Sequence, residues 1–136
     1  DEVPPRISVL PTEDEHAAAL RETVAEARRL SDENHGIAAV VVPWKSQARR
    51  IQAILGDDAP RLMGRQDTLP ESGVILITLE LAKGLEFDHV IVPDASGELF
   101  PDEPLARRRL YTTISRATRR VDVLALKALT PLLAGE

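Results

Sequence analysis

The residues with the clearest potential for chemistry form a short charged stretch between two apolar runs. Lys83, Glu86 and Asp88 place three charges close together, and Gly84 among them can adopt a positive φ and allow close approach. The flanking runs, residues 74–77 and 90–92, are rich in β-branched side chains and are typical of buried strands. We therefore expect this stretch at the carboxyl end of the first strand, where open α/β sheets bind ligands. A solvated turn with compensating charges is the alternative.

A second string follows at residues 110–117, Leu-Tyr-Thr-Thr-Ile-Ser-Arg-Ala. Together with residues 78–88 it resembles motifs V and VI of superfamily 1 helicases, in the UvrD-like and HelD-like branch. The first motif matches at Thr78, Ala82, Lys83, Gly84, Leu85, Glu86 and Phe87, and the second at Leu110, Tyr111, Ser115, Arg116 and Ala117. The resemblance extends from about residue 37 onward and implies a C-terminal RecA-like domain with motifs IV to VI.

The resemblance implies a contact with ATP. Arg116 would be the arginine finger that reaches the γ-phosphate, because its planar, permanently charged group can bind phosphate oxygens in a bidentate manner. Glu86 would accept a hydrogen bond from the ribose, and Gly84 would leave room for the nucleotide. Lys45 stands two residues after the position where motif IV often has a phosphate-contacting Arg, so it is a candidate substitute; a solvated Lys at a helix start is the alternative.

The resemblance also implies a side that faces single-stranded DNA. Thr78 would lie on that side, and Glu80 occupies the position where family members often have a phosphate-binding His. An acidic side chain cannot favour a phosphate, and the net charge of −5 argues against a free-standing nucleic-acid binder. Aromatic side chains are few, and we expect Phe87 and Tyr111 in the core, so a grip on nucleic acid would be mainly to its backbone.

The chain has no Gly-x-x-x-x-Gly-Lys-Ser/Thr phosphate loop. The expected function is therefore that of the second RecA-like motor domain of an ATP-dependent DNA helicase or translocase. A missing N-terminal domain would supply the phosphate loop and the Mg²⁺ ligands, and the fragment alone would be inactive. One alternative is a HelD-like factor that remodels RNA polymerase, because the interval between residues 45 and 78 lacks the large domain that UvrD carries there. A non-catalytic RecA-like interaction domain is the other. Translocation polarity and DNA versus RNA preference remain open.

Composition is that of an ordinary globular protein, with 43% hydrophobic and 29% charged residues among 136. There is no cysteine and no apolar run of membrane length, so we expect a cytoplasmic protein that does not contact membrane. His16, His35 and His89 lack the spacing of a metal site, and each is expected at a surface or turn.

The order of apolar patterns predicts a RecA-like three-layer α/β domain with a mostly parallel sheet, spanning residues 1–136 as one domain with a tail or linker at 1–5. Expected strands are 6–10, 37–42, 74–77, 90–92 and 121–126, with a brief one near 61–63. A helix should run from the capping residue Thr12 to about residue 34, and a second over 48–55. A third helix should begin at Pro104 and carry Arg116 at the margin of its apolar stripe. Phe100 is expected to be exposed and Thr130 to open a last helical turn.

Overall fold

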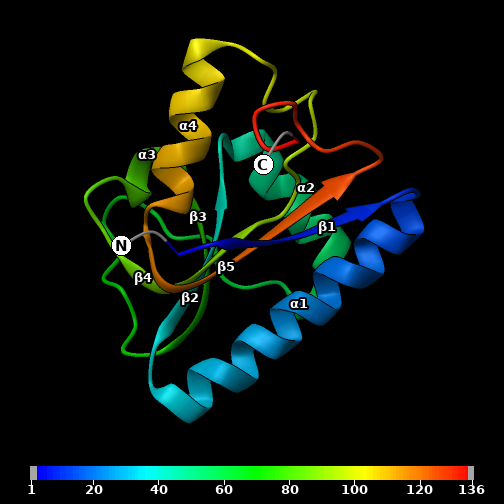
Figure 1. Ribbon diagram of the computed structural model, residues 1–136. Coiled ribbons are helices and arrows are strands. Elements are labelled where there is room, and N and C mark those ends of the chain that lie inside the picture. The colour runs from blue at the N-terminus through cyan, green and yellow to red at the C-terminus, as the bar shows by residue number, and fades with distance from the viewer. Residues whose placement is uncertain (1–2, 135–136) are drawn as a thin grey trace.

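A five-stranded parallel sheet forms the centre of the computed structural model, which describes residues 3–134 (Figure 1). The strands lie in the order β1-β5-β4-β2-β3. Their bounds are β1 Pro5–Leu10, β2 Ile37–Val42, β3 Gly73–Thr78, β4 Phe87–Val92 and β5 Ala117–Leu126. The helices are α1 Glu13–Asn34, α2 Lys45–Leu55, the one-turn α3 Leu79–Ala82 and α4 Pro104–Ile114, with a 3₁₀ turn at Gly56–Asp58. The predicted α/β class with a mostly parallel sheet is confirmed.

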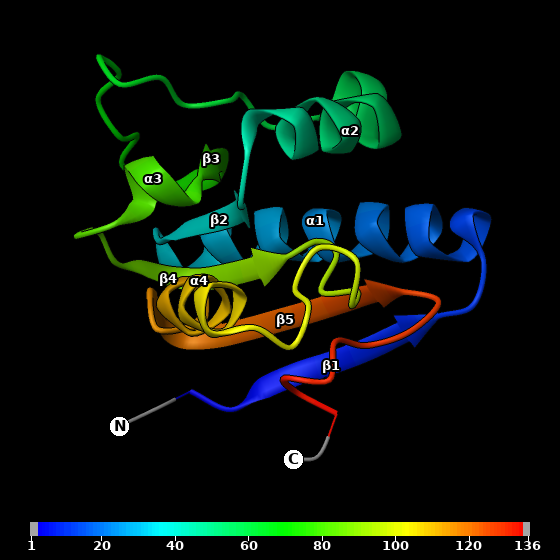
Figure 2. The ribbon, with the colours of Figure 1, turned by 90° about the horizontal axis from the view of Figure 1, so that it is seen from above.

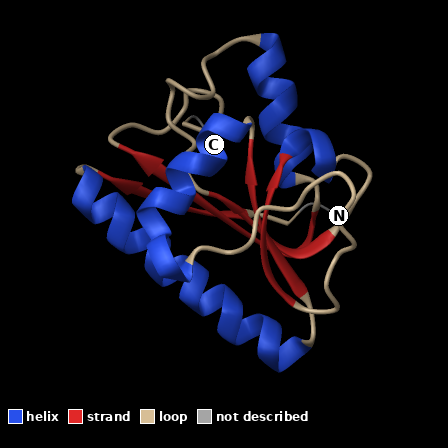
Figure 3. Ribbon diagram, turned by 180° about the vertical axis from the view of Figure 1, so that it is seen from behind, coloured by secondary structure: helices blue, strands red, loops and turns tan. Residues whose placement is uncertain are grey.

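Helices cover both faces of the sheet and so make three layers (Figures 2 and 3). Side chains of β2 alternate between the two faces: Val40 packs beneath α1 and α2, whereas Val41 packs beneath α3 and α4. Because both faces are covered, β2 is an unbroken apolar run rather than an alternating one. This double burial explains why the sequence pattern located the strand correctly.

The ends of α1 follow the predicted signals. The Thr12 side chain accepts a hydrogen bond from the Glu15 amide at 3.1 Å, which satisfies one of the free amides of the first turn. At the other end His35 takes the left-handed conformation, with φ of 54°, directly after Asn34. The second helix begins earlier than predicted, since α2 starts at Lys45 rather than at residue 48.

Two local predictions near the site are wrong. Helix α4 ends at Ile114, so Arg116 lies in the turn to β5 and not on the helix. The reason is that Ala117, predicted on the helical stripe, pairs with Phe87 as the first residue of β5.

Two predictions about aromatic side chains also fail, and one about the last turn holds in part. Phe100 is 2% exposed and belongs to the core, whereas Tyr111 is 40% exposed. The Thr130 hydroxyl caps a last turn, as predicted, by accepting the Leu132 amide at 3.2 Å. This turn closes from the Leu133 amide to the Thr130 carbonyl at 3.1 Å and is not helical.

The two edges of the sheet are formed by β1 and β3. Pro5 already belongs to β1 and pairs with Val121, so the predicted tail is too long by that residue; residues 1–2 lie outside the described part. On the other edge Leu62 bridges Leu76 in parallel, which confirms a brief strand-like contact where one was predicted. Within residues 3–134 no helix is long and apolar enough to cross a membrane.

Candidate functional site

The predicted site residues divide between two opposite edges of the sheet. Thr78 ends β3 and Lys45 follows β2, so both lie at the carboxyl edge. Glu86 directly precedes β4 and Arg116 directly precedes β5, so these two lie at the amino edge. The expectation that the whole charged stretch sits at a carboxyl end is wrong for its second half. The cause is α3 and the turn after it, which carry the chain back across the sheet to the start of β4.

Arg116 is half-buried and is held by neutral hydrogen-bond acceptors. Its guanidinium donates to the Thr112 carbonyl at 3.2 Å, the Leu85 carbonyl at 3.4 Å and the Ser115 hydroxyl at 3.3 Å. In addition, the Phe87 amide donates to the Arg116 carbonyl at 2.8 Å. Within residues 3–134 no carboxylate forms an ion pair with Arg116, so neighbouring acids of this part do not neutralise its charge.

The turn that contacts Arg116 depends on Gly84. This glycine has φ of 83°, which L side chains rarely adopt, although a Cβ built there would meet nothing within 4 Å. The Leu85 amide donates to the Ala82 carbonyl at 3.0 Å and closes the turn. Glu86 follows with an exposed side chain. The structure therefore brings Gly84, Glu86 and Arg116 together at one edge.

Glu80 is not an isolated negative charge at the opposite edge. It pairs with Arg65 at 2.8 Å, and both side chains are largely exposed. An exposed pair of this kind contributes about 0–1 kcal/mol to stability. Thr78 nearby is buried, and Lys45 is exposed at the first position of α2. Arg65 was not singled out from the sequence, because nothing in a polar loop indicates which acid it will meet.

Asp94, which the sequence analysis did not single out, ties together the carboxyl ends of two strands. One carboxylate oxygen accepts the Ser96 amide at 3.2 Å and the Leu126 amide at 3.1 Å. The other oxygen pairs with Arg50 of α2 at 3.0 Å. A buried His16 also bonds to the Pro93 carbonyl at 2.7 Å. The sequence signal was available: an acid two residues after a buried strand.

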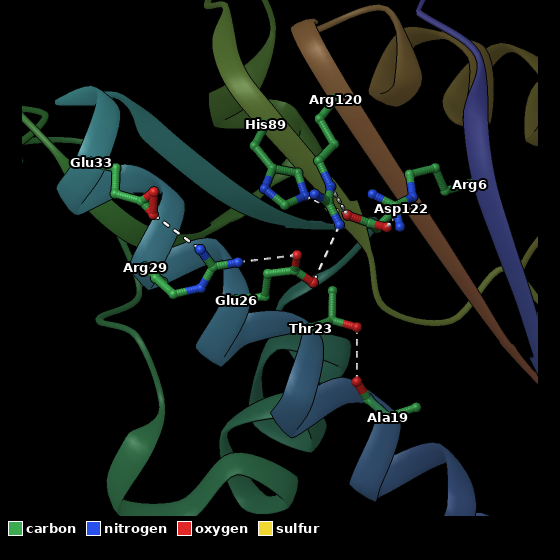
Figure 4. A network of polar contacts seen from close by, with 9 residues as sticks. All are labelled: Arg6, Ala19, Thr23, Glu26, Arg29, Glu33, His89, Arg120 and Asp122. Carbon is green, nitrogen blue, oxygen red and sulfur yellow. Dashed lines mark hydrogen bonds and ion pairs between the residues drawn. The ribbon is translucent and has the colours of Figure 1, made fainter.

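A polar network lies between α1 and the sheet (Figure 4). His89 bonds to Asp122 at 2.6 Å, and Arg120 contacts both Asp122, at 2.8 Å, and Glu26, at 3.4 Å. His89 and His16 are both buried, so the prediction of surface or turn positions is wrong for these two and correct for His35, which ends α1. No cluster of three or more His, Asp or Glu that could hold a metal ion exists among residues 3–134.

Asp122 should make stability depend on acid pH. Burial raises the pKa of Asp122, but hydrogen bonds from His89 and Arg120 outweigh this effect and hold the pKa below its usual value of 3.8. A lowered pKa means that the stabilisation is fully present above about pH 4 and is lost as the pH falls through the folded-state value. At pH 6 the free energy of unfolding of Asp122→Asn should therefore be lower than that of the native chain. The difference between the two should shrink toward pH 3. Urea unfolding across this range measures it, and a difference that grows on acidification would contradict the assignment.

Comparison with known proteins bears directly on the two motifs. The family model of the UvrD-like helicase C-terminal domain matches residues 73–124, from β3 almost to the end of β5. Residues 73–124 are therefore similar to the UvrD-like helicase C-terminal domain. A solved structure, the C-terminal domain of a possible DNA helicase from Lactobacillus plantarum WCFS1, is 27% identical with a TM-score of 0.77, covering 98% of this chain and 80% of that chain. No curated protein matches the sequence at a significant level.

The resemblance stated from the two motifs is thus confirmed. The segment that matches the family model includes Thr78, Gly84, Glu86 and Arg116, whereas Lys45 lies outside it. The family match covers the residues at the amino edge but assigns no role to any of them.

Proposed function

We propose that this chain is the second RecA-like motor domain of an ATP-dependent DNA helicase or translocase, and that Arg116 is its arginine finger. One observation carries the proposal: a half-buried Arg116 is oriented entirely by neutral acceptors and has no acidic partner among residues 3–134. A structural arginine would normally pair with a carboxylate, whereas a finger needs its charge free for phosphate.

The geometry also favours joint action of the finger and the ribose contact. The Leu85 carbonyl accepts a hydrogen bond from Arg116, and Leu85 lies between Gly84 and Glu86. A shift of this turn would therefore move the proposed ribose acceptor and the finger together. In phosphoryl transfer, catalysis depends mainly on such positioning and on offsetting the charge that develops on the γ-phosphate.

The remaining parts of an ATP site belong to another domain in this proposal. The described residues offer no carboxylate cluster that fits Mg²⁺, so its ligands and the phosphate loop are assigned to a missing N-terminal domain. Single-stranded DNA would contact the opposite edge, near Thr78 and Glu80. The short interval between residues 45 and 78 is compatible with the alternative role on RNA polymerase, and a non-catalytic interaction domain is the other alternative. A cytoplasmic location is part of the same proposal.

The isolated chain tests the half-site. It should unfold cooperatively in urea yet release no phosphate from ATP above background, since it has no phosphate loop. Steady-state phosphate release with Mg²⁺ and single-stranded DNA present is the measurement. Turnover that purifies with the chain and disappears in its Arg116→Ala variant would overturn the proposal.

A further inference from the structure

Trp44 is a large aromatic residue that the fold leaves exposed. It lies between β2 and α2, retains 41% of its surface, and caps α2 only through its backbone. The guanidinium carbon of Arg109, on α4, lies 5.3 Å from the centre of the Trp44 ring, within the range of a cation–π contact. Leu105, one turn before Arg109 on α4, is 50% exposed. We call Trp44, Leu105 and Arg109 the Trp44 patch.

The Trp44 patch lies at the carboxyl edge of the sheet, beside the residues proposed to face single-stranded DNA. Val42 pairs with Thr78, so β2 and β3 end at the same level of the sheet. Trp44 follows two residues after that end of β2. Lys45, the next residue along the chain, adds an exposed positive charge at the start of α2. Arg116 lies beyond the C-terminal end of α4, in the turn at the opposite, amino edge of the sheet.

We propose that the Trp44 patch binds one base of single-stranded DNA by stacking on Trp44, with Arg109 and Lys45 beside the strand's phosphates. An aromatic face with an adjacent arginine suits a base of any sequence, because every base offers a π-face. The inference rests on the DNA-binding part of the proposed function and names the side chain that performs it. Two exposed acids, Asp102 and Glu103, precede α4, and their negative charges oppose phosphate binding on that side.

The chain carries its own probe for this contact, because Trp44 is its only tryptophan. At low salt, titration with a ten-nucleotide oligo-dT should quench the tryptophan fluorescence. An oligomer of the same length without bases, which keeps the phosphates, should quench much less. Equal quenching by both strands would mean a phosphate contact only and would overturn stacking. No response to either would also overturn it and would assign the patch to a protein partner, while the role of Arg116 in ATP turnover is tested separately.

Substitutions test which residues bind the strand, and the fluorescence anisotropy of a labelled oligo-dT measures the affinity of each variant. Trp44→Ala should weaken binding by about 5- to 150-fold, and Trp44→Phe should restore part of it. Tyr111→Ala is the matched control, since Tyr111 is equally exposed on α4 but borders a hollow on the side of β1. Equal affinities of Trp44→Ala and Tyr111→Ala would overturn the proposal. Circular dichroism checks that each variant folds, and the fluorescence of the unaltered chain decides the matter if one does not.

Discussion

Arg116→Ala in the full-length protein is expected to reduce ATP turnover by about three to five orders of magnitude, the usual effect of removing an arginine finger. The half-buried guanidinium is oriented by the Thr112 and Leu85 carbonyls, so it needs little rearrangement before it meets a phosphate. Arg116→Lys should rescue little, because a compact ammonium cannot reproduce two parallel hydrogen bonds. Phosphate release at saturating ATP measures the loss.

Stability separates this role from a structural one. The bonds of Arg116 go to neutral groups at the margin of the fold, so the melting temperature of Arg116→Ala should fall by only a few degrees. Arg108→Ala is the control, since Arg108 is exposed on α4, the helix that precedes the Arg116 turn. If Arg116→Ala hydrolyses ATP as fast as Arg108→Ala, Arg116 is not the finger.

Asp94→Ala should lower the free energy of unfolding by about 2–5 kcal/mol, well beyond the loss expected for breaking an exposed ion pair. The carboxylate is 5% exposed, and its removal leaves the Ser96 and Leu126 amides without an acceptor. Each buried amide left unpaired costs about 1–3 kcal/mol, and the ion pair with Arg50 is lost as well. Urea unfolding near neutral pH gives the free energy directly.

Two variants make the Asp94 prediction specific. Asp94→Asn keeps an oxygen acceptor for the two amides and should lose less than Asp94→Ala. Glu80→Ala removes an exposed ion pair with Arg65 and should cost about 0–1 kcal/mol. A loss for Asp94→Ala no greater than that for Glu80→Ala would show that the carboxylate is not a structural anchor.

The elements of this fold could be predicted where burial imposes a pattern. The run at 37–42 is apolar because both faces of β2 are covered, and Thr12 caps α1 because its free amides need an acceptor. The end of α4 could not be predicted from periodicity. Ile114 and Ala117 keep helical spacing, yet Ala117 contributes to β5 because Phe87 pairs with it. Long-range pairing of this kind overrides local preference.

The site was only partly predictable for the same reason. The candidate residues were chosen by motif, but their division between two edges depends on the path of α3, which the sequence pattern did not show. The exposure of aromatic residues was missed too: Tyr111 fits a helical stripe but faces outward, and Phe100 sits in a polar loop but points into the core. Neither orientation follows from spacing alone, because it depends on which element packs above.

The pairing of β1 with β5 delays the folding of this domain during its synthesis on the ribosome. Pro5 meets Val121, which is made 116 residues later. At about 5–20 residues per second, β1 waits about 6–23 s for β5, the strand with which it pairs. During that time Ile7 and Val9, which stay partly exposed even after folding, are open to any other chain. The first strand of the domain to be synthesised is thus paired only after the last one has been made. Slower synthesis would lengthen the period in which the nascent protein can aggregate.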